Sequence, residues 1–441
     1  MSEHIERWLL LSSNGKAGPE SIERYRERRG YAGAERALTE LSPEAVTGMV
    51  EKVRLRGRGG GGFPVARKWR LARDNAKGTT YVVANAYDAD PAAPISRALI
   101  EHTPHALLEG LIIAAYAVGA HEAFVYIRGE NAEAVRRLRL AIAEAEEQRL
   151  LDVDAFGGAW PLTVRIVRGW GGFSGGEETA ALEAIEGRRA MPRQKPPYPV
   201  EVGLWGYPTV VHSAETLANL PPILLGGVAD QIAQELDSGF GMKIVGLCGD
   251  VAKPGLVEVP FGATLREIIF GLGGGVPEGR KVKGVQIGGP TGAVLPASYL
   301  DTPLGYRSLA AADAFLGSGS MHVIADDGCA VHYALDQISY LAHESCGKCV
   351  PCRLGLQRLV GLLEGVVSNI GRQSDVLLMQ ELAEVVQNSS LCGFGAKAPT
   401  VLLSTILHFR QDYGDHIEAG RCTPGHCQPL RTRRLERKTA I

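Results

Sequence analysis

The sequence lacks any long hydrophobic run. In its 441 residues the longest apolar stretch, Leu111 to Ala120, is far shorter than the roughly 20 residues of a membrane-spanning helix. The first residues, Met1 to Glu6, also lack the basic start and the apolar stretch of a secretory signal. We therefore expect a cytoplasmic protein without a direct membrane span.

An excess of either charge and an abundance of cysteine are missing as well. The 47 Lys and Arg residues nearly balance the 49 Asp and Glu residues, so a polyanion-binding surface is not indicated and no nucleic-acid partner is expected. Only eight cysteines occur, and four of them form one pattern. This usage excludes a disulfide-rich secreted scaffold and favours metal ligation.

Glycine is the residue in excess, with 55 in the chain. Many gather in two blocks, the first glycine block (Gly57 to Pro64) and the second glycine block (Gly169 to Gly176), where backbone can come close to a ligand. Lys68 follows the first block and could add a positive charge for a phosphate, or be a solvated surface lysine. Glu177 and Glu178 follow the second block, and capping of a helix could by itself explain them.

Strand and helix patterns alternate in the first half of the chain, which predicts a layered α/β domain. The later part changes to short β-rich runs and then to helices with cysteines between them, which predicts a small β module and a helical bundle with a metal centre. A segment at 191–222 contains many prolines and is expected to be mostly extended or looped. Helices are expected at 38–50, 107–118, 132–149, 335–343, 353–367, 376–387 and 400–413, and strands at 80–85, 123–127, 162–167, 243–248, 255–259 and 282–287.

The most specific motif is a set of cysteines at spacings of three, followed by a remote fourth. Three such thiolates can face one cuboidal cluster and the fourth can complete its coordination, as in a [4Fe–4S] centre. Zinc is the alternative, but structural zinc more often takes two pairs of ligands separated by a short span. The expected cluster ligands are Cys346, Cys349, Cys352 and Cys392.

Four segments together resemble a known family: the first glycine block with Lys68-Trp69, Gly176 to Thr179, Glu215 to Asn219 and Glu344 to Cys349. The chain resembles the flavin-bearing, NADH-oxidising subunit of respiratory complex I and its relatives in NAD-dependent formate dehydrogenases and bifurcating hydrogenases. This resemblance implies FMN, NAD(H) and a [4Fe–4S] cluster as cofactors. It also identifies the small β module as a β-grasp domain. The implied domains are a helical cap (1–50), an FMN- and NADH-binding α/β domain (51–238), the β-grasp domain (239–325), a helical [4Fe–4S] domain (326–415) and a basic tail with Cys and His (416–441).

The same resemblance implies roles for individual residues. The segment Asn85 to Pro91 matches a nicotinamide-binding segment of the family, but with aspartates in place of its glutamates and Tyr87 in place of an aspartate. The implied residues around the flavin and nicotinamide are Gly57, Arg58, Gly59, Gly60, Lys68, Asn85, Phe173, Gly176, His212 and Ser213. The implied catalytic carboxylates are Asp88, Asp90, Glu177 and Glu178.

A second group of metal-ligating residues lies near the C-terminus. His416, Cys422 and Cys427 resemble the tail of those relatives and could hold zinc, with His426 or Cys329 as a further ligand. The alternative is a basic tail with incidental thiols.

The expected function is an electron-entry subunit, in which hydride passes between NADH and FMN and single electrons pass through the cluster. The expected partners are a small [2Fe–2S] subunit and a larger formate dehydrogenase, hydrogenase or complex I-like assembly. One alternative is a paralogue that keeps the fold and the cluster as a relay or assembly module without NADH oxidation. Another is a ligand-binding module that rests on residues 242–320 alone.

Overall fold

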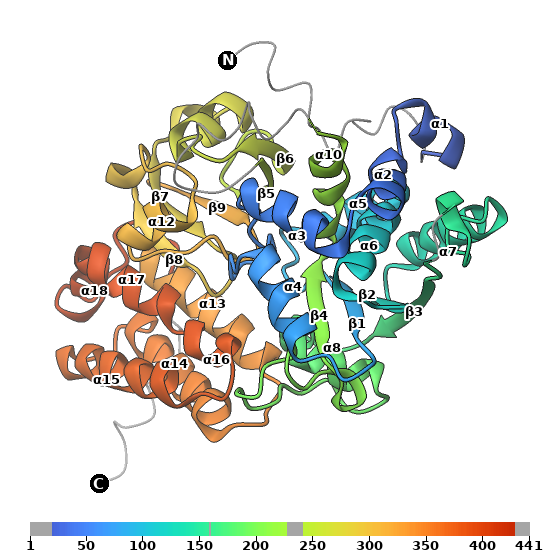
Figure 1. The fold of residues 1–441 in the computed structure, drawn as a ribbon. Helices are drawn as coiled ribbons and strands as arrows, with labels where there is room; N and C mark the ends of the chain where they lie inside the picture. The colour runs from blue at the N-terminus through green and yellow to red at the C-terminus, as the bar shows by residue number, and fades with distance from the viewer. Residues whose placement is uncertain (1–19, 158–159, 227–240, 428–441) are drawn as a thin grey trace, which may run out of the picture.

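The computed structural model describes residues 20–157, 160–226 and 241–427. The start of the expected helical cap, the expected domain boundary at 238 and the end of the tail lie outside these ranges. In Figure 1 the α/β unit fills one half of the molecule, and the β-grasp and helical units share the other half. None of the described helices is long and apolar enough to cross a membrane.

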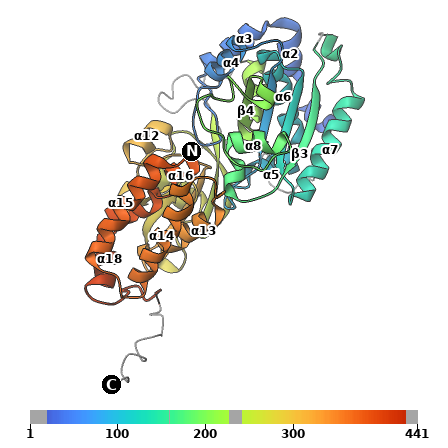
Figure 2. The same ribbon diagram turned by 90° about the horizontal axis from the view of Figure 1, so that it is seen from below.

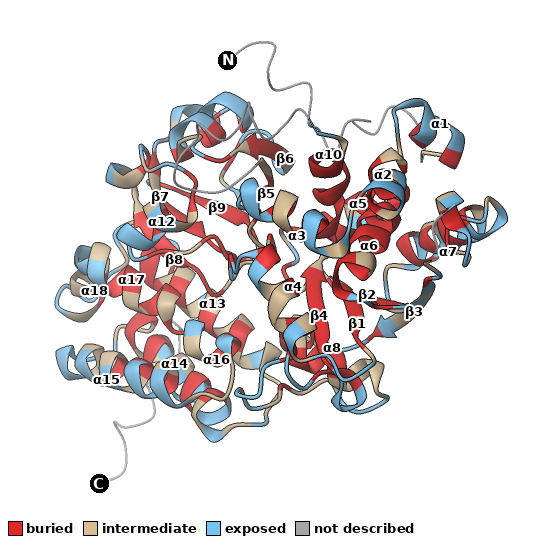
Figure 3. Cartoon of the chain, in the orientation of Figure 1, coloured by how far each residue is buried: buried red, intermediate tan, exposed pale blue. Residues whose placement is uncertain are grey.

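The α/β unit is built on a four-stranded parallel sheet in the order β3-β2-β1-β4. Asn85 of β1 lies in register with Ser213 of β4, so the segments that leave these two strands meet at one edge of the sheet. Figure 3 shows the central strands and helix α6 as buried. The strands are β1 (Tyr81–Ala86), β2 (Glu122–Arg128), β3 (Thr163–Gly169) and β4 (Thr209–Ser213), and the helices between them are α5 (Ile95–His102), α6 (Pro104–Val118), α7 (Ala132–Glu147) and α8 (Glu178–Ile185).

The N-terminal part of the unit contains α1 (Ile22–Glu27), α2 (Ala32–Glu40), α3 (Pro43–Lys52) and α4 (Val65–Asp74). The single helix expected at 38–50 is wrong, because α2 ends and α3 begins within this range. Ser42 causes the break, since its hydroxyl accepts from the Ala45 N–H at 3.2 Å and Pro43 takes the first helical position.

The proline-rich segment is only partly extended, so the expectation for 191–222 needs correction. It contains β4, α9 (Ala214–Ala218) and the start of α10 (Leu220–Leu225). Pro221 and Pro222 stand in the first turn of α10, where a helix has no use for their missing N–H groups.

The β-grasp unit has a mixed five-stranded sheet in the order β6-β5-β9-β7-β8 with its own hydrophobic core. The short helix expected before Phe270 is a π-helical segment, Glu267–Leu272, and α12 (Tyr306–Ala311) follows later in the chain. The strands are β5 (Met242–Gly249), β6 (Gly255–Pro260), β7 (Val282–Ile287), β8 (Ala293–Pro296) and β9 (Ser320–Ala325).

The C-terminal unit is a bundle of helices, which Figure 2 shows at the opposite end of the molecule from α7. The helix expected at 400–413 is divided at Phe409 into α17 and α18. Cys427 belongs to the core of this bundle, so the described part of the tail folds back onto the helices. The helices are α13 (Ala330–Glu344), α14 (Val350–Val367), α15 (Gln373–Ser389), α16 (Gly393–Lys397), α17 (Thr400–His408) and α18 (Arg410–Ile417).

Candidate functional site

The first glycine block is a tight turn between α3 and α4, closed by the Gly57 N–H donating to the Phe63 carbonyl at 3.0 Å. Gly60 has a φ of +112°, and a Cβ there would lie 2.8 Å from the carbonyl oxygen of Gly317. Gly59 and Gly61 are exposed, and a Cβ at Gly61 would meet no atom within 4 Å. This block therefore presents bare backbone that a phosphate or a flat ring can approach, which fits an FMN site.

The Arg58 side chain points away from this exposed backbone. It is 1% exposed, it donates to the Met242 carbonyl at 3.2 Å, and its guanidinium lies 4.6 Å from the centre of the Phe261 ring. Its backbone N–H donates to the Thr216 hydroxyl at 2.8 Å. Arg58 thus joins the glycine block to the β-grasp unit.

Charged residues connect the elements that follow the two blocks. Lys68 Nζ in α4 lies 3.7 Å from Glu178 Oε2 in α8, and Lys195 Nζ lies 3.0 Å from Glu178 Oε1 and 2.8 Å from Glu177 Oε1. Burial opposes the charged form of Glu178, but Lys68 and Lys195 hold its pKa below the ordinary value. Glu177 also caps α8 by accepting from the Thr179 and Ala180 N–H groups, as the capping alternative predicts. Nothing in the sequence singled out Lys195.

The second glycine block contacts the loop that carries the expected cluster cysteines. The Phe173 N–H donates to the Glu344 carboxylate, and a Cβ at Gly172 would lie 2.5 Å from Glu344 Oε2. The Phe173 ring lies 5.7 Å from the ring of Phe394, which follows Cys392 by two positions. The expected flavin region and the expected cluster region are therefore in direct contact.

The segment Asn85 to Pro91 supports the second block. The Asn85 side chain donates to the Gly176 carbonyl at 2.8 Å, and the Tyr87 hydroxyl donates to the Gly171 carbonyl at 2.6 Å. Tyr87 is 1% exposed and stacks on Tyr126 with ring centres 5.2 Å apart. The tyrosine that departs from the family pattern is thus a packing residue.

The two aspartates of this segment face protein groups. Asp88 accepts from the Ser96 N–H at 3.0 Å and the Arg97 N–H at 2.6 Å, at the start of α5. Asp90 accepts from the Ala92 N–H at 3.0 Å, the Ser320 hydroxyl at 2.5 Å and the Ser318 hydroxyl. Their direct contact with a nucleotide stays a prediction.

His212 and Ser213 end strand β4 beside the first block. Burial and then Lys68 hold the pKa of His212 well below its ordinary value, so the ring is neutral and its Nε2 accepts from Trp69 Nε1 at 2.9 Å. The Ser213 hydroxyl caps α9, and a Cβ at Gly59 would be 3.5 Å from Ser213 Cβ. Ser213 therefore lies next to the exposed backbone, whereas His212 lies in the core.

The four expected cluster cysteines meet between α13, α14 and α16. Cys346 and Cys349 lie in the loop before α14, Cys352 in its first turn, and Cys392 at the N-cap of α16. Burial raises the pKa of Cys352 to about 11, and the three other thiols contribute to that rise. Within the described residues, no three of these thiols lie as close as 4.8 Å to one another. That spacing suits a multi-iron cluster better than one shared ion.

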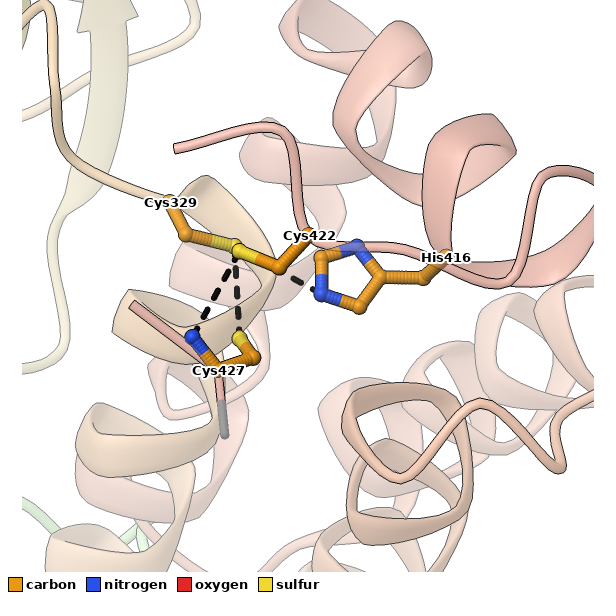
Figure 4. A group of neighbouring side chains, drawn as sticks. All are labelled: Cys329, His416, Cys422 and Cys427. Carbon is orange, nitrogen blue, oxygen red and sulfur yellow. Dashed lines mark hydrogen bonds between the residues drawn. The ribbon is translucent and has the colours of Figure 1, made fainter. Parts of the chain in front are cut away.

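A second metal-ligating group lies at the other end of α13, and Figure 4 shows its four side chains pointing toward one another. The ligand atoms of Cys329, His416, Cys422 and Cys427 all lie within 4.8 Å. Cys329 Sγ is 3.9 Å from His416 Nε2 and 3.7 Å from Cys427 Sγ. His416 Nδ1 lies 2.8 Å from the Asp412 carbonyl oxygen, which orients Nε2 toward the thiols. Of the two further ligands considered from the sequence, Cys329 joins the group and His426 does not.

Comparison with known proteins gives matches over both regions. Residues 50–222 match the family model described as the Nuo51 FMN-binding domain, and residues 332–416 match that of the NADH-ubiquinone oxidoreductase-F iron-sulfur binding region. The HndC subunit of the NADP-reducing hydrogenase of Solidesulfovibrio fructosivorans is 39% identical over 95% of this chain and 85% of its own length. A second-copy F-type subunit of the NADH-quinone oxidoreductase of Rhizobium meliloti is 41% identical over 90% of this chain and 94% of its own length.

The fold also has a solved counterpart. A chain of an NAD+-reducing [NiFe]-hydrogenase in the H2-reduced state superposes with a TM-score of 0.79 and 33% identity. The match covers 88% of this chain and 65% of that one.

Proposed function

Because this chain belongs to the family of the F-type subunits of NADH-quinone oxidoreductases, we propose that it is the electron-entry subunit of a multisubunit NAD(H)-linked oxidoreductase. It is an NADH dehydrogenase-type subunit with FMN and a [4Fe–4S] cluster. The observation that carries this function is the contact between the second glycine block and the cluster loop, through Glu344 and Phe173. A group bound at the glycine blocks would lie close to a cluster bound at the cysteines.

The bound FMN would supply the chemistry, by taking hydride from NADH and releasing electrons singly. The chain supplies binding and orientation. The exposed backbone of Gly59 and Gly61 offers N–H groups to the cofactor, and Ser213 borders it. Lys68, Lys195 and Glu178 hold α4 and α8 together, so the two glycine blocks keep a fixed relation. Cys346, Cys349, Cys352 and Cys392 would bind the cluster.

Titration of anaerobically purified protein with NADH tests this function. Bleaching of the flavin absorbance, followed by reduction of the cluster, is expected for the electron-entry subunit. Cluster absorbance in a protein that binds no flavin and does not react with NADH would favour the relay paralogue, which the altered Asn85 to Pro91 segment motivates. A protein without iron would favour a ligand-binding module instead.

Larger redox complexes contain the named relatives of this chain, which are a hydrogenase subunit and quinone oxidoreductase subunits. We therefore place this chain in a formate dehydrogenase, hydrogenase or complex I-like assembly, in the cytoplasm, with a small [2Fe–2S] subunit as its companion. Purification from its native source through a tag on this chain, followed by mass spectrometry, identifies the partners. A chain that purifies alone would contradict this assignment.

We also propose a zinc site at Cys329, His416, Cys422 and Cys427. Three thiolates and one imidazole are a common ligand set for structural zinc. The pKa of Cys329 lies well below the usual thiol value, chiefly because the Cys427 thiol donates to it, while burial opposes the shift. Metal analysis of the purified protein should give one zinc per chain besides the cluster iron.

A further inference from the structure

A single loop of the β-grasp unit contacts several segments of the proposed flavin site. This bridging loop, Gly317 to Ser320, leads into strand β9. At its first residue, the carbonyl oxygen of Gly317 lies against the backbone of Gly60 in the first glycine block. Its two serine hydroxyls donate to Asp90. None of these contacts is visible from sequence spacing.

Asp90 receives three hydrogen bonds in a nearly closed environment. It is 2% exposed, and its donors are the Ala92 N–H and the hydroxyls of Ser318 and Ser320. Two of these donors belong to the bridging loop, so the position of Asp90 follows the position of that loop. A buried carboxylate that loses such donors loses much of its compensation for leaving water.

The contact at Asp90 continues to the second glycine block along one short stretch of chain. Tyr87, three residues before Asp90, donates to the Gly171 carbonyl, and Asn85 donates to the Gly176 carbonyl. Arg128 also donates to the Gly171 carbonyl, at 2.9 Å. A shift of Asp90 would therefore move the groups that hold the second block.

The first block rests on the same unit through further contacts. The Tyr306 hydroxyl in α12 donates to the Gly57 carbonyl at 2.8 Å, and the Tyr306 ring lies against Gly62. Gly319 of the bridging loop lies against Lys243, whose Nζ pairs with Glu215 of α9 at 2.6 Å. The bridging loop thus contacts the first block directly and the second block through Asp90.

We propose that the bridging loop sets the spacing between the two glycine blocks, and that Asp90, Ser318 and Ser320 are positioning residues for the bound flavin. This inference rests on the proposed function. It gives the β-grasp unit a defined task, which is to brace the flavin site from behind. Asp90 then acts through the backbone of the segment that it anchors.

The affinity of the apoprotein for FMN, measured by quenching of flavin fluorescence, tests this proposal with Asp90→Ala and with the double variant Ser318→Ala, Ser320→Ala. Each is expected to raise the dissociation constant about tenfold or more, the equivalent of one strong hydrogen bond. The triple variant should bind no worse than the weaker of these two, because all three residues form one contact. At saturating FMN, KM for NADH should rise more than kcat falls.

The matched control is Ser308→Ala, an exposed serine of the same unit whose hydroxyl donates only to the Pro303 carbonyl. Cluster iron and melting temperature report whether each variant is folded. If Asp90→Ala does not fold, Asp90→Asn keeps one acceptor oxygen and should give an intermediate loss of affinity. Unchanged FMN affinity in folded variants, or additive losses in the triple variant, would overturn the proposal. A wild type that binds FMN but fails to oxidise NADH would instead overturn the proposed function.

Discussion

At the scale of single residues, the ion pair of Glu215 and Lys243 ties the α/β unit to the β-grasp unit. Lys243 is fully buried, and Glu215 also accepts from the Ile244 N–H at 2.8 Å. Burial lowers the pKa of Lys243, while Glu215 opposes that shift. Each charge compensates the other, so the loss of one partner leaves an unpaired charge in the interior.

We expect Lys243→Met to lower the free energy of unfolding by about 3–5 kcal/mol, because the Glu215 carboxylate would remain buried without its partner. Thermal unfolding followed by circular dichroism measures the effect. The apolar pair Lys243→Met, Glu215→Leu should recover much of the loss. Lys253→Met, at an exposed position of the same unit, is the control, and an equal melting temperature for it and Lys243→Met would contradict the prediction.

Asp88 gives a prediction about pH. Burial raises its pKa to about 6, although the N–H groups of Arg97 and Ser96 oppose the shift. The folded-state pKa lies above the unfolded value of 3.8, so the stability that Asp88 contributes is present below pH 3.8 and is lost as the pH rises through about 6. Asp88→Asn should therefore be more stable than the wild type at pH 7–8, by about 1–3 kcal/mol, and equal near pH 4.

Melting temperatures of the two proteins between pH 4 and pH 8 measure this difference. Asp74→Asn, at an exposed position, should show no such dependence on pH. A constant difference between wild type and Asp88→Asn at all pH values would mean that the carboxyl group does not titrate in this range.

The residue types at the site were predictable from the sequence, but their orientations were not. The partners of Asp90 lie 228 and 230 residues later in the chain, and no local pattern connects them. The same holds for Glu344, which reaches Phe173 across 171 residues. Sequence spacing identified which segments assemble, while the direction of each carboxylate depends on contacts between units.

At the scale of elements, helices α13 and α14 flank the loop of the proposed cluster. We expect Cys349→Ala to remove the cluster iron, because three remaining thiolates leave one iron without its ligand. Iron analysis and the paramagnetic resonance spectrum of the reduced protein measure the loss. Cys248→Ala is the control, since that thiol lies in β5 and donates only to the Met321 carbonyl at 3.5 Å. Full iron in Cys349→Ala would show that the ligand assignment is wrong.

The opposite end of α13 carries Cys329 and allows the proposed zinc site to be tested separately. Cys329→Ser should release zinc while the cluster iron stays, because a serine hydroxyl is a poor replacement for a thiolate ligand. Plasma emission analysis for both metals measures this in one sample. His426→Ala is the matched control, because His426 lies in the same loop but outside the group of four. Loss of zinc from His426→Ala alone would contradict the assignment.

Most elements were predictable because their hydrophobic periods are local, as β2 and α7 illustrate. The errors occurred where single residues decide a boundary. Ser42 begins a new helix within an unbroken apolar pattern, and the prolines of α10 stand where a helix tolerates them. The fold of 416–427 onto the helical core depends on Cys329, which is far away in sequence.

At the scale of the whole molecule, the described chain has one proposed route for electrons, from the glycine blocks to the cluster. A flavin delivers two electrons in sequence, so continuous turnover needs a partner that removes them. We expect the isolated chain to reduce an artificial one-electron acceptor with NADH, and to need its companion subunits for its natural acceptor. Steady-state assays with and without those subunits measure this, and equal rates with the natural acceptor would contradict it.

The contact between Gly60 and Gly317 has a consequence for mutational screens. A Cβ at Gly317 would lie 2.2 Å from the carbonyl oxygen of Gly288, and one at Gly288 would lie 2.6 Å from that of Phe315. Three glycine backbones from distant parts of the sequence are therefore stacked behind the flavin site. A saturation screen for loss of yellow colour should score Gly288 and Gly317 as severely as Gly60. Intolerance to substitution in this protein consequently marks the wall of the site as well as its lining.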